Sequence, residues 1–334
     1  MNPEALYYRK LKGKLVQCEL CPRNCVIAEG QVGFCRVRSN HDGNLISLVY
    51  GKSSGVQVDP IEKKPFFHFL PGSRALSFGT VGCTLRCTFC QNFQISQASA
   101  SFPSEELPPN RIVGLAREYA CESIAYTYNE PTVFYEYMAD TARLARKKGI
   151  RNLMVSNGFI SQKPLAEACK FIDAANIDLK GFSNKFYGSM TASWLEPILQ
   201  ALKTLHKKHV WLEITNLIIP KHNDNPEEIK QMCGWIMDNL GPDVPLHFSA
   251  FRPDYLLQDV PVTSVESLLS ARELASKSGL KHVYLGNVIT NDGETTFCPK
   301  CGKALIKRLR MTIISSNMDG RCCSFCGEKI PGVF

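Results

Sequence analysis

Three cysteines in one short loop constrain this 334-residue chain more than any other feature. The segment Cys83-Thr-Leu-Arg-Cys87-Thr-Phe-Cys90 has C-x3-C-x2-C spacing and follows the apolar run 75–79, which predicts a strand. A four-iron cluster takes four ligands, so three thiolates leave one iron free to bind a ligand that is not protein. The pattern therefore predicts a [4Fe–4S] cluster with one open iron at the end of a strand.

Zinc binding and simple packing are the other uses of such thiols. A closed structural zinc site takes four ligands in two pairs, one ligand more than this loop supplies. Buried single cysteines pack as small apolar residues. Three cysteines within eight residues, close to Gly79 and Gly82, do not fit that pattern. The loop is therefore interpreted as a cluster site.

The three-cysteine motif, with Phe89 directly before its third cysteine, resembles the signature of the radical S-adenosylmethionine (SAM) superfamily. In that superfamily the amino and carboxylate groups of SAM bind the open iron. The resemblance implies reductive cleavage of SAM to methionine and a 5′-deoxyadenosyl radical, which abstracts hydrogen from a substrate. It also implies a one-electron donor such as ferredoxin or flavodoxin.

Apolar, β-rich runs alternate with helix-period segments through the middle of the chain. The runs are 75–79, 123–128, 152–156, 174–179, 210–219, 246–251 and 282–285, with helical patterns such as 133–148 and 264–278 between them. This alternation predicts βαβ units and a parallel sheet. We predict an α/β fold, a partial (β/α)6 TIM-type barrel, with its active site at the carboxyl ends of the strands.

Polar residues follow several of the predicted strands. They are Asn129, Glu130, Ser156, Asn157, Asp178, Lys180 and the run 220–224. The resemblance implies that 129–132 replaces a Gly-Gly-Glu-Pro segment whose acid holds the SAM amino group, although the glycines are absent here. It implies SAM ribose and carboxylate contacts for Ser156 and Asn157. Asp178 and Lys180 match a D-x-K motif in which both residues lie near SAM.

Each of these residues also has a purely structural interpretation. Glu130-Pro131 is a common start of a helix, with Asn129 as its cap, and Asn157-Gly158 is a common turn. Asp178 and Lys180 point to the same face of a strand and could form a structural ion pair. Their joint position at successive strand ends favours a site. We assign no catalytic residue beyond these cofactor-binding groups.

Two further cysteine groups lie at the ends of the chain. Cys298, Cys301, Cys323 and Cys326 form two C-x2-C knuckles, which predict a closed zinc ribbon, although a rubredoxin-like iron site uses the same ligands. Near the start, the spacing C-x2-C-x3-C-x9-C favours zinc, with an auxiliary electron-relay iron–sulfur cluster as the alternative. These cysteines are Cys18, Cys21, Cys25 and Cys35. We predict an N-terminal four-cysteine metal-binding region at 1–72, the core at 73–290 and the ribbon at 291–334.

Taken together, the motifs resemble the radical SAM proteins of the AmmeMemoRadiSam system, relatives of the pyruvate formate-lyase activating enzyme. The segments that carry this resemblance are 18–25, 33–38, 58–65, 83–92, 129–131 and 298–301. The kinship suggests a peptidyl glycine as the substrate. The terminal regions could equally present another protein or a small molecule, so the sequence does not name the substrate.

Charge and composition narrow the remaining classes. The formal net charge of +8 falls to about +3 once metal-bound thiols are counted as thiolates. The basic residues are also scattered, which disfavours a radical SAM enzyme acting on RNA. A non-catalytic zinc and iron–sulfur interaction protein would leave the polar strand ends unexplained. Eleven of the fifteen cysteines lie in metal-type groups, and there is no long apolar stretch, which together predict a cytoplasmic enzyme with no membrane partner.

Overall fold

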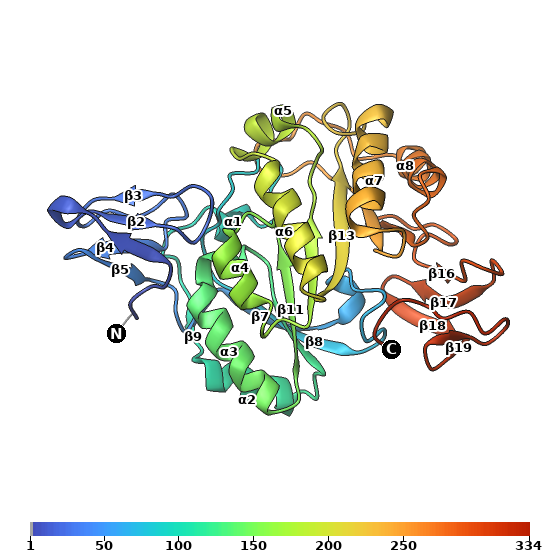
Figure 1. Cartoon of the computed structure of the whole chain (residues 1–334), viewed down its shortest axis with the longest axis horizontal. Coiled ribbons are helices and arrows are strands. Elements are labelled where there is room, and N and C mark those ends of the chain that lie inside the picture. Colours follow the sequence, from blue (N-terminus) through green and yellow to red (C-terminus); the bar gives the residue numbers. More distant parts are fainter. Residues whose placement is uncertain (1–2) are drawn as a thin grey trace.

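An eight-stranded sheet forms the centre of the protein, for which a computed structural model describes residues 3–334 (Figure 1). The strand order is β15-β14-β13-β12-β11-β10-β8-β7, and all neighbours pair in parallel except β7, which is antiparallel to β8 at one edge. All seven predicted strands belong to this sheet. The bounds are β7 (Gly55–Pro60), β8 (Arg74–Gly79), β10 (Ser123–Tyr126), β11 (Arg151–Ser156), β12 (Ala174–Asp178), β13 (Trp211–Ile218), β14 (Leu246–Ala250) and β15 (Val283–Gly286).

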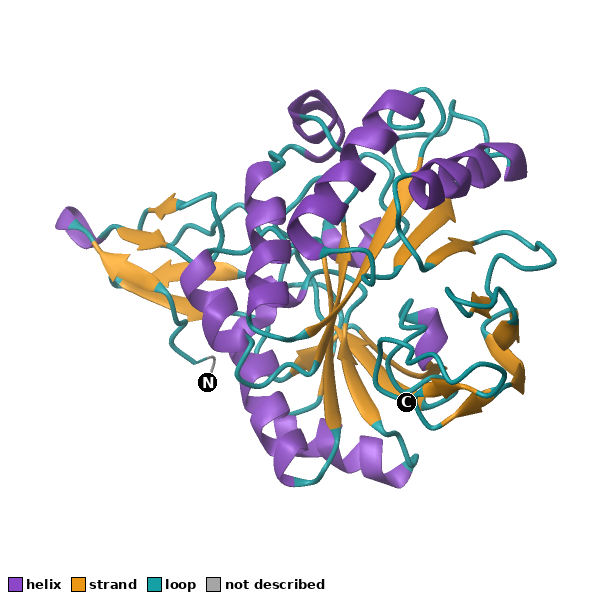
Figure 2. Ribbon diagram, turned by 45° about the vertical axis from the view of Figure 1, so that its right-hand side comes forward, coloured by secondary structure: helices purple, strands orange, loops and turns teal. Residues whose placement is uncertain are grey.

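Helices connect each parallel strand to the next one along the chain. Because strand order follows chain order, right-handed crossovers place these helices on one face of the sheet, as Figure 2 shows. This is the topology of an open, partial barrel. The helices are α1 (Phe93–Ser96), α2 (Pro109–Glu118), α3 (Tyr135–Lys147), α4 (Gln162–Ala168), α5 (Asn184–Phe186), α6 (Glu196–Lys207), α7 (Pro226–Leu240) and α8 (Val265–Lys277). Shorter turns are η1 (Lys12–Lys14), η2 (Ile61–Lys63), η3 (Pro131–Phe134) and the π-helical Tyr187–Thr191.

In-register pairing aligns the carboxyl ends of the strands. Phe78 of β8 and Met154 of β11 both pair with Tyr126 of β10. The loops that follow these strands therefore begin at the same edge of the sheet. The predicted site loops, which continue from the same strand ends, are brought together by this register.

Strand β7 lies in the segment that the sequence analysis placed in the N-terminal region, yet it completes the central sheet. Its Val56 and Val58 alternate with polar residues, and both are half-buried. Such alternation suits an edge strand, where Pro60 is also tolerated because its missing N–H is not needed. The N-terminal region is thus joined to the core through shared strand pairing.

The rest of the N-terminal region projects from one end of the molecule (Figure 1). A buried ion pair holds it to the core: Arg38 Nη1 lies 3.0 Å from Glu136 Oε1 of α3, and the same carboxylate accepts from Leu6 N. Removing one partner of such a pair typically costs about 3–5 kcal/mol. Its small sheets comprise β1 (Tyr8–Lys10), β2 (Val16–Cys18) and β3 (Val26–Ile27), and β4 (Arg38–His41) with β5 (Asn44–Ser47). Its β6 (Lys52–Ser53) pairs with β9 (Glu105–Glu106) of the core.

The C-terminal region packs at the opposite end of the molecule (Figure 1). Arg308 is buried there and lies 3.3 Å from Glu62, while its Nη2 donates to Phe67 O. The segment around Phe67 is fixed in turn by Glu213 of β13, which accepts from the Phe67 and His68 amides. The strands of this region are β16 (Thr296–Phe297), β17 (Ala304–Leu309) and β18 (Thr312–Ser316), then β19 (Met318–Asp319) and β20 (Cys322–Cys323).

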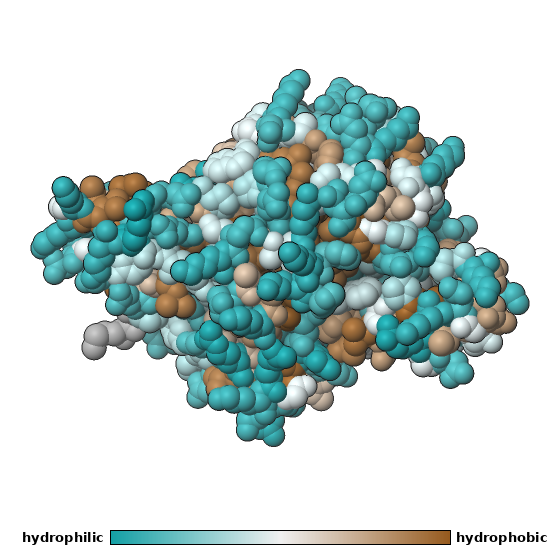
Figure 3. Space-filling view, viewed as in Figure 1, coloured by the Kyte–Doolittle hydropathy of each residue, from teal (hydrophilic) through white to brown (hydrophobic). Residues whose placement is uncertain are grey.

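Hydrophilic residues cover most of the face drawn in Figure 3, and the apolar patches on it are scattered. Most apolar side chains pack instead in a core formed by the strands of the central sheet and the helices that cover it. Among residues 3–334, no helix has the length and apolar character that crossing a membrane requires.

Candidate metal and cofactor site

A cavity of about 230 Å³ lies at the carboxyl edge of the central sheet. Residues that end or follow seven parallel strands line it, as barrel geometry leads one to expect. Four of the residues predicted at the ends of the strands after β8 line this cavity: Asn129, Asn157, Asp178 and Lys180. The three cysteines of the C-x3-C-x2-C loop, Cys83, Cys87 and Cys90, line it as well.

The cysteine loop is held in place by an amide from the neighbouring strand end. Asn129 Oδ1 accepts from Thr80 N at 3.1 Å, and its Nδ2 donates to Gly82 O at 2.8 Å. Cys83 and Cys87 are buried, whereas Cys90 is half-buried and lies 3.1 Å from Ser96 Oγ. Asn129 therefore acts on the shape of the loop, in addition to lining the cavity.

Two N–H groups approach the sulfur of Cys83. Asn157 Nδ2 lies 3.6 Å and Leu85 N lies 3.4 Å from Cys83 Sγ. Burial raises the pKa of Cys83 well above its usual range, and the charge of Glu130 adds to this effect. Burial likewise raises the pKa of Cys87 to about 12. These thiols thus need a cationic centre to ionise, which fits the chemistry of an iron–sulfur ligand set.

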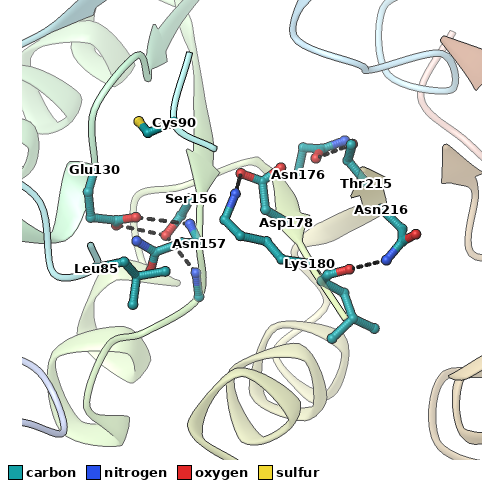
Figure 4. A network of polar contacts seen from close by, with 12 residues as sticks. Leu85, Cys90, Glu130, Ser156, Asn157, Asn176, Asp178, Lys180, Thr215 and Asn216 are labelled. Carbon is teal, nitrogen blue, oxygen red and sulfur yellow. Dashed lines mark hydrogen bonds and ion pairs between the residues drawn. The ribbon is translucent and has the colours of Figure 1, made fainter. Parts of the chain in front are cut away.

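Glu130, which is predicted to contact the amino group of SAM, does not line this cavity. Its carboxylate is fully buried and accepts from Thr132 N (2.9 Å), Thr132 Oγ1 (2.7 Å), Ser156 Oγ (2.8 Å) and Asn157 N (2.9 Å). It caps η3 and fastens that turn to the end of β11 (Figure 4). These contacts are those of a residue at the start of a helical turn, as in the structural interpretation above. The capping residue, however, is Glu130 itself and not Asn129. Ser156 is likewise occupied by Glu130 and does not line the cavity.

Asp178 and Lys180 form an ion pair on the cavity wall, with Lys180 Nζ 2.9 Å from Asp178 Oδ2 (Figure 4). Burial by itself lowers the pKa of Lys180, but the charges of Asp178 and of the Cys87 and Cys90 thiols outweigh it and raise the pKa. The ammonium therefore stays charged beside the cysteine loop. The two interpretations given for Asp178 and Lys180 therefore combine: the residues form an ion pair, and both line the cavity.

On the last three parallel strands, sequence reasoning missed the polar residues of the cavity: Thr215 in β13, Ser249 in β14 and Asn287 after β15. It selected the polar run 220–224 instead, whose Asn223 is buried and caps its own loop through Ile219 N. The missed residues sit inside or directly after predicted strands. The inward alternation of strand side chains is the signal that could have identified Thr215 and Ser249.

The terminal cysteine groups differ in geometry. In the C-terminal region, the four sulfurs of Cys298, Cys301, Cys323 and Cys326 lie within 4.8 Å of one another. Two of the separations are 3.6 Å between Cys298 Sγ and Cys326 Sγ and 3.7 Å between Cys301 Sγ and Cys323 Sγ. Near the start of the chain, a separate small cavity is lined by Cys18, Cys21, Cys25 and Cys35.

Known proteins share this architecture. The family model of the radical SAM superfamily matches residues 78–236. An uncharacterised protein of Methanocaldococcus jannaschii is 46% identical over 98% of both chains. The pyruvate formate-lyase 1-activating enzyme of Escherichia coli K12 is 22% identical over 64% of this chain and 93% of its own. A radical SAM methyltransferase structure from Sphaerobacter thermophilus superposes with a TM-score of 0.52 at 13% identity, covering 71% of each chain. With its three cysteines at the end of the first parallel strand, this chain belongs to the radical SAM superfamily of enzymes.

Proposed function

We propose that this enzyme holds a [4Fe–4S] cluster on Cys83, Cys87 and Cys90, and that it abstracts hydrogen from a peptidyl glycine. The observation that carries the cluster assignment is the convergence of these thiols with Asn157 and the Asp178–Lys180 pair on one cavity. When bound, such a cluster supplies one electron to SAM, which yields methionine and a 5′-deoxyadenosyl radical.

The chain's own residues hold and orient the reactants. Asn157 Nδ2 donates toward Cys83 Sγ, which stabilises negative charge on that ligand. Lys180 lines the cavity, and its ammonium is paired with the carboxylate of Asp178. The same ammonium can bind a further anionic group, such as the carboxylate of SAM. Thr215, Ser249 and Asn287 also line the cavity, where polar groups can orient a substrate.

A test of the cofactor chemistry uses protein reconstituted with iron and sulfide without oxygen. With SAM and dithionite, the enzyme should form 5′-deoxyadenosine, and the variant Cys83→Ala/Cys87→Ala/Cys90→Ala should form none. Cys169→Ala, which changes a half-buried thiol outside all three groups, is the matched control. Unchanged product in the triple variant would exclude this cluster assignment.

The glycine proposal rests on the relationship to the activating enzyme. A glycine-containing peptide with deuterium on the α-carbon should transfer deuterium into 5′-deoxyadenosine, measured by mass spectrometry. The same peptide labelled only at neighbouring residues is the control. Transfer from the control alone would exclude a glycine substrate while leaving the radical chemistry in place.

We also propose zinc at the C-terminal four-cysteine group. Zinc–thiolate bonds of about 2.3 Å place tetrahedral sulfurs nearly 4 Å apart, and the observed separations of 3.6 and 3.7 Å fit that spacing. Cys298→Ser/Cys301→Ser should release about one zinc and lower thermal stability, because a structural zinc contributes folding energy. Cys322→Ser, a neighbour outside the group, should keep it. Iron in place of zinc in purified protein would contradict the proposal.

We propose that the protein is cytoplasmic and takes its electrons from an external donor. All fifteen cysteines are free, which is consistent with the reducing cytoplasm. We propose a low-potential one-electron donor of the ferredoxin or flavodoxin type. Reduction of the cluster by such a donor, followed by electron paramagnetic resonance (EPR), tests this; no reduction by either donor would contradict it.

A further inference from the structure

The N-terminal cysteines enclose a small cavity of their own. Cys18, Cys21, Cys25 and Cys35 line a space of about 20 Å³ together with Arg23 and Arg38. A cavity inside a protein needs a volume of about 10–15 Å³ to hold one water molecule. The four thiols therefore border a space that can hold a water molecule.

The sulfur spacing here differs from that of the C-terminal group. Across residues 3–334, Cys298, Cys301, Cys323 and Cys326 form the only group of three or more metal-ligating side chains whose ligand atoms all lie within 4.8 Å. The N-terminal four are thus set wider than that, as are Cys83, Cys87 and Cys90 of the cluster loop. Neither the N-terminal site nor the cluster loop therefore has the compact sulfur arrangement of the C-terminal group.

The space that the four N-terminal thiols line argues against a single zinc ion bound by them. Zinc sits about 2.3 Å from each sulfur, which is closer than a water molecule can approach a sulfur atom, so a formed zinc site has no room for water at its centre. A four-iron cluster places iron and sulfide between its thiolates and spreads them further apart. A space that admits a water molecule is therefore wider than a formed zinc site, in the direction that a cluster requires.

The wall of this cavity also carries a donor without a partner. Arg38 Nε is buried and has no hydrogen-bond partner among the described residues, while the Nη1 of the same side chain pairs with Glu136. Arg38 is close enough to Cys18 and Cys35 for its charge to act on both thiols. Donors near the sulfurs of a cluster, and positive charge beside it, stabilise its reduced form. A cluster would give the buried guanidinium the acceptor it lacks.

The two cysteine sites are neighbours. Thr84 lines the N-terminal cavity, and its hydroxyl accepts at 3.1 Å from Asn157 Nδ2, the same nitrogen that lies 3.6 Å from Cys83 Sγ. Arg23 of the N-terminal cavity donates to Thr84 O at 2.8 Å. The wall of this cavity therefore includes Thr84, the residue that directly follows the first ligand of the cluster loop, Cys83.

We propose that Cys18, Cys21, Cys25 and Cys35 bind a second [4Fe–4S] cluster, which relays electrons to the cluster on Cys83, Cys87 and Cys90. Three of its ligands, Cys21, Cys25 and Cys35, are half-buried and give an external donor access. One electron passes from the donor to the second cluster and then from the second cluster to the first. The second cluster is thus reduced and reoxidised, and no proton is transferred. The relay role rests on the proposed function, whereas the metal site does not.

Acid-labile sulfide tests the site, because neither zinc nor a rubredoxin-like iron contains it. Reconstituted wild-type protein should contain about eight sulfides per chain, and Cys83→Ala/Cys87→Ala/Cys90→Ala should keep about four. Zinc should stay near one per chain in both. A triple variant without sulfide, or with two zincs, would overturn the proposal, and this result does not depend on SAM cleavage.

A second pair of variants tests the relay. Cys21→Ser/Cys25→Ser should lower sulfide to about four per chain and slow the reduction of the remaining cluster by flavodoxin at least tenfold, measured by rapid-freeze EPR. Reduction by dithionite, a small molecule that can enter the open cavity, should be affected less. Cys25→Ser alone serves if the double variant fails to fold, and Cys169→Ser is the control. Equal flavodoxin rates with the second cluster lost would overturn the relay.

Discussion

The carbonyl oxygen of Cys35 lies so close to Gly82 that a Cβ at position 82 would overlap it. A Cβ there would also lie 2.8 Å from Val37 Cγ1, and Gly82 has a φ of +84°. The N-terminal region is therefore packed directly onto the backbone that precedes the first ligand of the cluster loop. The contact explains why a glycine is needed two residues after Thr80, at the start of this loop.

Gly82→Ala should destabilise the protein by more than about 1–3 kcal/mol, since the left-handed backbone alone costs that much and the overlap adds to it. It should also lower iron incorporation at the cluster loop. Urea unfolding and iron analysis measure both. Gly114→Ala in α2, where nothing lies within 4 Å, is the control and should be neutral or stabilising by up to about 1 kcal/mol. Equal losses in both variants would contradict this account.

Glu130→Gln should destabilise the protein even without iron or SAM. Its carboxylate accepts four hydrogen bonds, and one of them comes from Asn157 N. An amide can offer only one oxygen, so its NH2 group would face an N–H or hydroxyl donor, at a cost of about 1–3 kcal/mol. Urea unfolding of metal-free protein measures this. Unchanged stability, with a weakened affinity for SAM, would instead return Glu130 to the cofactor site.

Asn157 should set the reduction potential of the cluster on Cys83, Cys87 and Cys90. A donor 3.6 Å from Cys83 Sγ favours the more negative, reduced state. Asn157→Ala should therefore lower the potential, and Asn157→Asp, which replaces the donor by an anionic acceptor, should lower it further. EPR-monitored titration measures the order. Asn92→Ala, whose amide donates to Tyr128 O instead, should leave the potential unchanged; a potential equal in all four proteins would exclude the role of Asn157.

The sequence allowed the seven parallel strands and the cysteine loop to be predicted because both depend on local patterns: apolar runs with period two or continuous burial, and thiols at fixed spacing. The role of Glu130 could not be predicted in this way. Its partners Ser156 and Asn157 are 26 and 27 residues away, and a helix cap and a ligand contact have the same sequence signature. The choice between zinc and a cluster at Cys18–Cys35 depends on the width of a folded site, which spacing along the chain does not fix.

His68 should make the stability of the protein depend on pH between about 6.5 and 4. It is fully buried beneath the sheet, with its ring nitrogens 2.7 Å from Pro331 O and 2.6 Å from the Tyr284 hydroxyl. Burial lowers the pKa of His68 to about 4, although the Glu213 charge opposes the shift. The unfolded chain, with a pKa near 6.5, binds more protons in this window than the folded protein, so stability falls as pH falls.

The loss should reach about 3 kcal/mol at pH 4. His68→Gln should be less stable than wild type at pH 7, because it disturbs both ring contacts, yet its stability should change less from pH 7 to pH 4. Urea unfolding across this range measures the two slopes, and acid loss of metal affects both proteins alike. His222→Gln, at an exposed position after β13, should keep the wild-type slope. If the slope of His68→Gln equals that of wild type, the acid sensitivity arises elsewhere, and His68 joins the C-terminal region to the core without contributing to its pH response.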